Sequence, residues 1–477
     1  MIRKLPDGFV LGAATSAYQV EGTAGSRRPC VWDSWFWKNG CPFDGTQASD
    51  SYHHYEEDIA ACRDYHIGAL SISFAWTRLI DADGRPDESG LAFYDRVIDA
   101  CLAAGVEPYV ALYHFDMPKA LADRGGWLAP GTISAFTRYA RLCFEHFGDR
   151  VKYWITMKDP VTEAVNGYVT GLFPPGEKAK IPEALYAMHK MLVAHSRTVN
   201  LYRSLALDGK IGFVHRAEPV YPAADVKVDR KAAWLDDVFT NRFVLDAVLD
   251  GKYSAEVRDA LDEILARTGE SFAPPYEELA QIRDASAQLD FLGLNYYTSH
   301  FAAAWQGGFE VQHNAAGEPG TSTYALPGIS RRVPRAKVRA TDWDWSIFPQ
   351  GLYDILVRIH REYPEKPILL TENGIGLHET LLDNTVEDDD RIDYLRQHLA
   401  AVLDAIEDGV PVKGFFVWSL VDAMSWANGY DKRYGLFYVD YAHGSRRYAK
   451  KSAEWYRDLA KKRIMLTISG LNMSLEK

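Results

Sequence analysis

Cysteine is scarce in this sequence and follows no spacing pattern. The 477 residues include five cysteines, Cys30, Cys41, Cys62, Cys101 and Cys143. Their odd number and wide scatter, with no Cys-x-x-Cys pair, give neither a disulfide framework nor a zinc site. We therefore expect each thiol to be a small buried hydrophobic group, and the protein to be cytoplasmic with its thiols reduced.

Long apolar runs are also missing. No run approaches the roughly 20 residues that a membrane-spanning helix needs. The opening residues, MIRKLPDGFVLGAATSAYQVEG, have two early cations, but the apolar stretch is interrupted by Gly12 and soon meets Gln19 and Glu21. This is unlike a signal peptide. A soluble protein without a membrane partner is expected.

Positive charge is in deficit. The formal net charge is −12, and the longest basic blocks are Arg331-Arg332 and Lys461-Lys462-Arg463. Such a field does not favour nucleic acid as a partner. Hydrophobic residues make up 47% and charged residues 25%, which is typical of a globular chain with a sizeable core. None of these features indicates an oligomeric state.

Short apolar runs rich in Val, Ile, Leu and Phe recur along the whole chain. Continuous rather than alternating hydrophobicity is typical of parallel strands that are covered on both faces. Eight such runs are found, at 9–16, 68–76, 107–115, 152–157, 210–215, 291–297, 367–373 and 412–420.

Amphipathic segments lie between these runs. They include 89–105, with a serine start signal and a glycine stop, and 389–409. Strand followed by helix, eight times over, predicts a single-domain α/β fold, a (β/α)₈ barrel that spans residues 1–477. The longer gaps at 216–290 and 298–340 are expected to be elaborated loops.

Polar and aromatic residues gather at the predicted carboxyl ends of the strands, where barrel enzymes place their active sites. Two carboxylates facing each other in a pocket with aromatic walls suit glycoside hydrolysis. Neither clustered metal ligands nor a glycine-rich nucleotide loop is present, so no cofactor is implied. The residues at or just after the strand ends are Gln19, Arg78, His114, Asp159, Asn295, Tyr297, Glu372, Trp418 and Ser425.

Five motifs carry a resemblance to a known family. They are FVLGAATSAYQVEG, YHFDMPKAL, GLNYYT, LLTENG and WSLVDAMSWANGYDKRYGLFYVD. Together and in this order they resemble glycoside hydrolase family 1, the retaining β-glycosidases, over nearly the whole chain. The resemblance implies hydrolysis of a small-molecule β-glycoside.

The family's site residues carry over to matching positions. The resemblance makes Glu372 the nucleophile, and makes Arg78 and Tyr297 the neighbours that keep it ionised and oriented. A buried structural network is the alternative for those two neighbours. The resemblance also assigns Gln19, His114 and Trp418 to the glycone site and Trp345 to the aglycone side, and Asn295 is a further candidate substrate contact.

The last motif indicates the type of sugar. Ser425, Lys432 and Tyr434 reproduce a spacing that resembles 6-phospho-β-glycosidases, where the trio binds a 6-phosphate. A phosphate dianion needs donors and positive charge, and Ser425 stands where a glutamate would repel it. Trp426 resembles the 6-phospho-β-galactosidase arrangement, with activity on 6-phospho-glucosides also open. A β-glucosidase or β-galactosidase acting on unphosphorylated sugars is the alternative enzyme.

Lys158-Asp159-Pro160 departs from the family's Asn-Glu-Pro, in which the glutamate is the general acid/base. Aspartate is one methylene shorter, and a misplacement of about 1 Å can cost on the order of 10²-fold in rate. Lys158 is expected to lower the pKa of Asp159, against the need of a general acid. Glu163, four residues on, is expected to be a solvated helix residue rather than a substitute acid.

Three interpretations of this departure stay open. Asp159 serves as the acid/base after a small adjustment, with Lys158 pointing elsewhere or touching an anionic part of the substrate. Alternatively, the acid is defective, and only aglycones that are good leaving groups are cleaved. In the third, the chain binds a sugar phosphate without turning it over.

Overall fold

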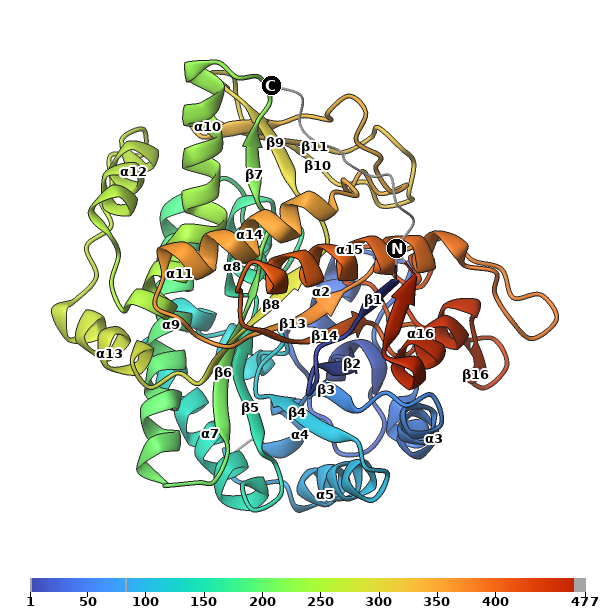
Figure 1. Ribbon diagram of the computed structural model, residues 1–477. Helices are drawn as coiled ribbons and strands as arrows, with labels where there is room; N and C mark the ends of the chain where they lie inside the picture. The colour runs from blue at the N-terminus through green and yellow to red at the C-terminus, as the bar shows by residue number, and fades with distance from the viewer. Residues whose placement is uncertain (1, 82–83, 467–477) are drawn as a thin grey trace.

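A closed barrel of parallel strands organises the chain (Figure 1). The computed structural model describes residues 2–81 and 84–466, and within that part eight parallel strands form the barrel in the order β13-β14-β2-β3-β4-β5-β6-β8. The predicted (β/α)₈ fold class is therefore confirmed. The strands are β2 (Val10–Ala14), β3 (Ala69–Ser73), β4 (Glu107–Ala111), β5 (Tyr153–Lys158), β6 (Lys210–Arg216), β8 (Phe291–Tyr296), β13 (Ile368–Asn373) and β14 (Val412–Trp418).

Each of these strands lies within or overlaps one of the eight apolar runs. The physical reason is burial on both faces, because the strand interiors pack against the barrel core inside and against helices outside. The principal helices on the outside are α3 (Ser51–Asp64), α5 (Glu88–Ala103), α7 (Thr132–Phe147), α9 (Ile181–Ser204), α13 (Tyr276–Ser286), α14 (Pro349–Glu362), α15 (Asp389–Glu407) and α16 (Lys451–Lys462).

Helix α5 begins differently from the prediction. The cap is Asp87 rather than Ser89, because the Asp87 carboxylate accepts hydrogen bonds from the N–H groups of Ser89 and Gly90. A carboxylate at this position satisfies amide groups that have no partner within the helix. The predicted glycine stop is present, since the helix ends at Ala103 and Gly105 adopts a φ of +70°.

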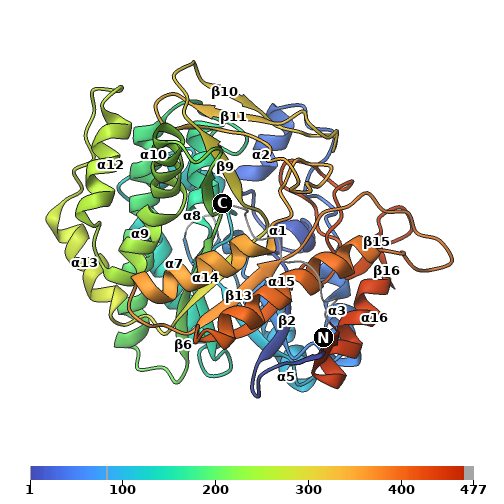
Figure 2. The same cartoon turned by 45° about the horizontal axis from the view of Figure 1, so that its top comes forward.

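The two long gaps contain secondary structure of their own. Residues 216–290 hold helices α10 (Lys227–Asp237), α11 (Phe243–Leu245), α12 (Ala255–Leu265) and α13. The strands β7 (Val220–Pro222), β9 (His300–Ala303), β10 (Glu310–Gln312), β11 (Thr323–Leu326) and β12 (Ser330–Arg332) form a second sheet. Figures 1 and 2 place most of this sheet above the barrel, at the top of both views.

The short segments at the carboxyl ends of the strands complete the architecture. They include α1 (Ala17–Val20), α2 (Val31–Lys38), α4 (Trp76–Leu79), α6 (Lys119–Ala122) and α8 (Pro160–Ala164). At the outer edges, β1 (Ile2–Lys4) pairs with β17 (Ile464–Leu466), and β15 (Phe437–Asp440) pairs with β16 (Arg446–Ala449).

The cysteine thiols follow the expectation of burial with one exception, Cys41. All five cysteines are free, and four of them are buried while Cys41 is partly exposed. Among the helices of residues 2–81 and 84–466, none combines the length and apolar character needed to cross a bilayer.

Candidate active site

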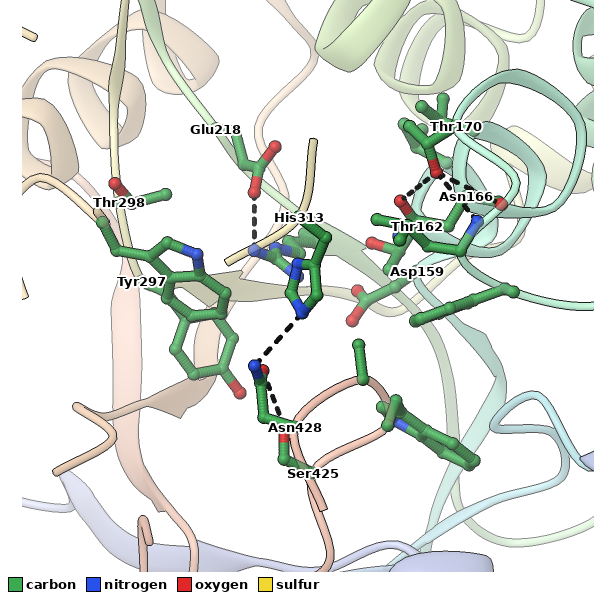
Figure 3. Close-up of a pocket in the computed structure, with 18 of the residues that line it drawn as sticks. Asp159, Thr162, Asn166, Thr170, Glu218, Tyr297, Thr298, His313, Ser425 and Asn428 are labelled. Carbon is green, nitrogen blue, oxygen red and sulfur yellow. Dashed lines mark hydrogen bonds and ion pairs between the residues drawn. The ribbon is translucent and has the colours of Figure 1, made fainter. Parts of the chain in front are cut away.

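A cavity of about 290 Å³ opens at the carboxyl ends of the barrel strands. Its size and its mixture of aromatic and polar walls suit a small-molecule ligand. Figure 3 shows Tyr297 on the left of this cavity, Asp159 on the right and Ser425 below. The predicted site residues that line it are Gln19, His114, Asp159, Tyr297, Trp345, Glu372, Trp418, Ser425, Trp426, Lys432 and Tyr434.

Glu372 lies near the end of β13, where the strand register shifts against β8. Its carboxylate is almost completely buried and binds two donors. The Tyr297 hydroxyl donates to Oε2 at 2.6 Å, and Lys158 Nζ donates to Oε1 at 2.7 Å. Both carboxylate oxygens are therefore held in place, and the buried negative charge has a cation in direct contact.

That cation is not the one expected from the sequence. Arg78 donates to Glu21 Oε2 at 3.0 Å and to the carbonyl oxygen of Ala24 at 2.6 Å, and its guanidinium lies over the Tyr52 ring. The prediction that Arg78 supports Glu372 is therefore wrong, because the Arg78 guanidinium binds Glu21 and Ala24 instead. Arg78 belongs to a buried network behind α1, the alternative named for it, whereas Tyr297 contacts Glu372 as expected.

Lys158 and Asn295 also differ from the prediction, because neither is among the residues that line the cavity. Both side chains are fully buried behind the carboxylates. Lys158 binds Glu372, while Asn295 Nδ2 donates to Asp159 Oδ2 at 2.8 Å and Asn295 Oδ1 accepts from Thr371 at 2.7 Å. They support the carboxylates instead of forming the wall that a ligand would touch.

Asp159 occupies a strained position between β5 and α8. Its φ of +50° is left-handed, a conformation that aspartate tolerates better than most residues, and Pro160 then starts the helix. One oxygen accepts from Asn295, while Oδ1 is buried with no partner among the described residues. The carboxyl group thus keeps one oxygen available at the cavity.

The pKa of Asp159 is raised to about 8 by burial and by the negative charge of Glu372, against the opposing effects of Asn295, Arg216 and Lys158. Lys158 does lower this pKa, as expected, but its effect is smaller than those of burial and of Glu372, so the net shift is upward. The Lys158 ammonium contacts Glu372. A protonated carboxyl at neutral pH is the state that a general acid requires.

Glu163 is not the solvated helix residue that was expected. Its Oε1 accepts hydrogen bonds from Tyr113 at 2.7 Å and Trp127 at 3.2 Å, and Oε2 is buried without a partner among the described residues. Burial raises its pKa to about 7. Glu163 lines a separate apolar cavity and not the one beside Glu372, so it is not placed to replace Asp159.

The predicted phosphate-binding trio lies across the cavity. Lys432 Nζ is 3.7 Å from the ring centre of Trp345 and 5.6 Å from that of Tyr434. Burial, and then the charge of Arg216, hold the pKa of Lys432 well below its ordinary value. Within the described part of the chain no carboxylate forms an ion pair with this ammonium, and Ser425 donates only a long hydrogen bond of 3.4 Å to Asn428.

Aromatic side chains shape the neighbouring wall. Trp426 packs against Trp32 with ring centres 4.4 Å apart and against Tyr18 at 5.5 Å. The polar atoms Gln19 Oε1 and His114 Nδ1 are buried here without partners among the described residues. These atoms can therefore hydrogen-bond to a ligand without losing an existing contact.

Sequence reasoning missed a charged group on the far side of the cavity. Arg216 is the last residue of β6, and its guanidinium lies 4.9 Å from the ring centre of Trp345 and 5.3 Å from that of Tyr297. Its partner Glu218, at the top of Figure 3, lies 2.7 Å away. The signal was present, because Arg216 directly follows the fifth apolar run, at the kind of strand end where site residues are sought.

Comparison with known proteins places this geometry in a family. The model of Glycosyl hydrolase family 1 matches residues 1–465. The 6-phospho-beta-galactosidase of Clostridium acetobutylicum is 46% identical, with 98% of both chains covered. A protein of the same description from Lacticaseibacillus casei is 44% identical over 98% of this chain and 100% of its own.

Solved structures give the same result. A family 1 b-glucosidase from Thermotoga maritima superposes with a TM-score of 0.86 at 33% identity, covering 98% of this chain and 100% of that one. The GH1 beta-glucosidase from Exiguobacterium antarcticum gives a TM-score of 0.87 at 30% identity, with 97% and 99% covered. The barrel, the carboxyl groups in the cavity and the family match all agree. The chain therefore belongs to glycosyl hydrolase family 1 and is a β-glycosidase.

Proposed function

We propose that this enzyme hydrolyses 6-phospho-β-galactosides by a retaining mechanism, with 6-phospho-β-glucosides as further substrates. The observation that carries the proposal is Lys432, a buried ammonium in the cavity wall that forms no ion pair with a carboxylate of residues 2–81 and 84–466. Burying an uncompensated cation is costly, and an anionic ligand removes that cost. The relatives named 6-phospho-beta-galactosidase support the same substrate class.

The phosphate would be bound at the end of the cavity formed after β14. Lys432 supplies positive charge, while the hydroxyls of Ser425 and Tyr434 supply hydrogen bonds to phosphate oxygens. Trp426 and Trp418 offer aromatic faces beside the sugar. Gln19 and His114, with their unused buried atoms, are placed to contact its hydroxyls.

In the first step Glu372 attacks the anomeric carbon, and the bond to the leaving oxygen breaks. Asp159 gives its proton to that oxygen, so that the aglycone leaves as a neutral alcohol. In the second step the Asp159 carboxylate takes a proton from water, which releases the sugar from Glu372 and restores both groups. The raised pKa of Asp159 suits the first step, in which it must start protonated.

Lys158 acts in this scheme as the counter-ion of the nucleophile. Its ammonium contacts Glu372 Oε1 at 2.7 Å and leaves Oε2 to Tyr297. This arrangement favours the first of the three interpretations of Lys-Asp-Pro, since the cation is directed away from Asp159. A sugar-phosphate-binding protein without turnover would have no use for a nucleophile held in this way.

The first measurement is steady-state hydrolysis of nitrophenyl 6-phospho-β-galactoside beside lactose 6-phosphate. The two substrates differ in how much protonation the leaving group needs. Cleavage of both is expected if Asp159 is a competent acid. Cleavage of the nitrophenyl compound alone would indicate a defective acid, and binding without cleavage of either would favour the binding protein.

Replacing Lys432 by alanine tests the sugar assignment. We expect kcat/KM for phosphorylated substrates to fall by about 10- to 100-fold, because a charge-assisted hydrogen bond to phosphate is lost, while unphosphorylated analogues lose little. Lys413→Ala is a matched control, since Lys413 is exposed near the start of β14, away from the cavity. Equal losses on phosphorylated and unphosphorylated substrates would instead support a glycosidase for plain sugars.

A further inference from the structure

The loop after β14 is tied to the segment after β10 by one side chain, Asn428. Its amide nitrogen Nδ2 lies 3.0 Å from the carbonyl oxygens of Asn314 and Ala315 and 3.1 Å from Nε2 of His313. These three residues are consecutive and directly follow β10. Figure 3 shows His313 in the middle of the view, with its imidazole directed toward Asn428. Asn428 therefore links two segments that are 113 to 115 residues apart in the sequence.

The contacts with segment 313–315 decide which way the amide of Asn428 faces. Two of its partners there are carbonyl oxygens, which only accept hydrogen bonds, so the NH₂ group must face them. Burial, and then the charge of Lys432, lower the pKa of His313 to about 4, so its ring is neutral near pH 7 and one nitrogen can also accept. The amide oxygen of Asn428 is consequently turned the other way, toward Ser425.

Ser425 and Asn428 belong to one tight turn. The N–H groups of Asn428 and Gly429 both donate to the carbonyl oxygen of Ser425, at 3.3 and 2.9 Å, and the N–H of Ser425 donates to that of Gly429 at 2.8 Å. The Ser425 hydroxyl donates to Asn428 Oδ1 over 3.4 Å, which is long for a hydrogen bond between two oxygen atoms. Such a contact orients the hydroxyl only weakly, and a phosphate oxygen would replace it as the acceptor.

The segment that anchors Asn428 is itself fixed from the opposite side. The side chain of Asn314 is buried, accepts hydrogen bonds from two backbone N–H groups of its own loop, and donates to the carbonyl oxygen of Asp342 at 2.8 Å. Asp342 lies three residues before Trp345, whose ring centre is 3.7 Å from Lys432 Nζ. The turn that carries Ser425 and the ammonium of Lys432 thus share one support.

We propose that Asn428 is a positioning residue of the phosphate site. Anchored on segment 313–315, it holds the turn 425–429 in place, so that the Ser425 hydroxyl is already directed to where a 6-phosphate oxygen binds. The inference rests on the proposed function, which makes Ser425 a phosphate ligand, and it adds the residue that places this ligand. Such preorganisation improves binding, because the hydroxyl does not have to be ordered when the substrate arrives.

A double-mutant cycle of Asn428→Ala and Ser425→Ala tests this role on nitrophenyl 6-phospho-β-galactoside. Asn428→Ala alone is expected to raise KM about 5- to 10-fold with kcat nearly unchanged, because substrate binding, not the chemical step, loses support. In the Ser425→Ala background the same substitution should cost less than about 2-fold, since the hydroxyl it acts through is gone. Equal losses in both backgrounds would overturn the proposal.

Nitrophenyl β-galactoside, which has no phosphate, separates positioning from a general structural role. We expect KM for this substrate to be unchanged in Asn428→Ala. A smaller folded fraction would instead lower kcat on both substrates by the same factor, and that result would contradict the proposal. Asn39→Ala is the matched control, because Asn39 also donates to a backbone carbonyl, that of Trp35 at 2.9 Å, but is exposed and is not among the residues that line the cavity. This control should change neither parameter.

Ser425→Ala alone tests the proposed function separately. A loss confined to the phosphorylated substrate supports Ser425 as a phosphate ligand, and independent effects of the two substitutions would then overturn the role of Asn428 alone. An equal loss on both substrates would remove Ser425 from the phosphate site, and the positioning role of Asn428 would fall with it.

Discussion

Lys158 and Asp159 are neighbours in the chain whose side chains serve different partners. The ammonium of Lys158 points to Glu372, and the carboxyl group of Asp159 turns to Asn295. The left-handed backbone at Asp159 produces this divergence, since it redirects the chain just where β5 ends. Adjacent lysine and aspartate residues suggest an ion pair with each other. Here, instead, Lys158 is the counter-ion of Glu372, and Asp159 has a raised pKa that favours its protonated form.

The raised pKa of Asp159 predicts the pH dependence of the reaction. Asp159 must be protonated to donate, so kcat/KM for lactose 6-phosphate should fall as the pH rises through about 8. In Asp159→Asn this limb should vanish, and the rate should drop by about 10²- to 10⁴-fold. Initial rates from pH 5 to 10 measure both effects.

Glu163→Gln is the matched control for this prediction. Glu163 is also a carboxyl group with a raised pKa, half-buried with its Oε2 enclosed, but it lines the other cavity. The limb near pH 8 should survive in this variant. Loss of the limb in Glu163→Gln and its survival in Asp159→Asn would move the acid role to Glu163.

The ion pair of Lys158 and Glu372 predicts a large effect on stability. Lys158→Met leaves the buried Glu372 carboxylate without its cation, and we expect the free energy of unfolding to fall by about 3–5 kcal/mol. Urea denaturation measures this change. The double variant Lys158→Met/Glu372→Gln should recover part of the loss, and no recovery would show that packing, not charge, sets the cost.

Particular residues show which parts of the site could be predicted from the sequence and which could not. Most of the predicted site residues line the cavity, because a barrel brings strand ends together whatever the side chains do. The choice between Arg78 and Lys158 as partner of Glu372 depends on side-chain direction and on a competing acid, Glu21. Neither the direction nor the competitor can be read from local spacing, and the same holds for the burial of Glu163.

At the scale of elements, irregular strand ends position the two carboxyl groups. The register shifts between Ile155 and Lys158 in β5, and between Leu370 and Glu372 in β13. Such irregularities re-aim side chains at the rims of barrels and next to active sites. The sheet thus departs from regular pairing beside both candidate catalytic residues.

The loop after β14 is fixed by a buried carboxylate, Asp422. It accepts hydrogen bonds from Arg433 at 2.7 Å, from Lys450 at 2.7 Å and from the N–H of Gly435 at 2.9 Å. Residues 425–434, which include the proposed phosphate-binding trio, lie between these contacts. The position of the proposed phosphate site therefore depends on a charge network whose members do not line the cavity.

Asp422→Asn tests this dependence. Removal of the negative charge leaves the half-buried Arg433 beside a neutral side chain and Lys450 with Glu379 as its remaining carboxylate, and we expect about 3 kcal/mol of stability to be lost in urea denaturation. KM for phosphorylated substrates should also rise more than KM for unphosphorylated ones. Asp431→Asn, an exposed acid in the same loop, is the control and should change neither quantity appreciably.

For the whole molecule, the fold was more predictable than the site. Each of the eight apolar runs corresponds to a barrel strand. A strand that is buried on both faces is a nearly continuous run of apolar residues, which is easily recognised in the sequence. The second sheet of β7 and β9–β12 was expected only as loop, since its strands are short and partly exposed. Short strands at the surface carry little periodic signal.

The pairing of β1 with β17 has a consequence for connectivity. Ile2 and Leu466 are direct partners in this antiparallel pair, and Arg463 also donates to the carbonyl oxygens of Phe9 and Pro6. The chain thus comes back to its starting point after one circuit of the barrel. A circular permutant that joins these two residues and opens an exposed surface turn would keep all eight barrel strands, with the same residues around the cavity.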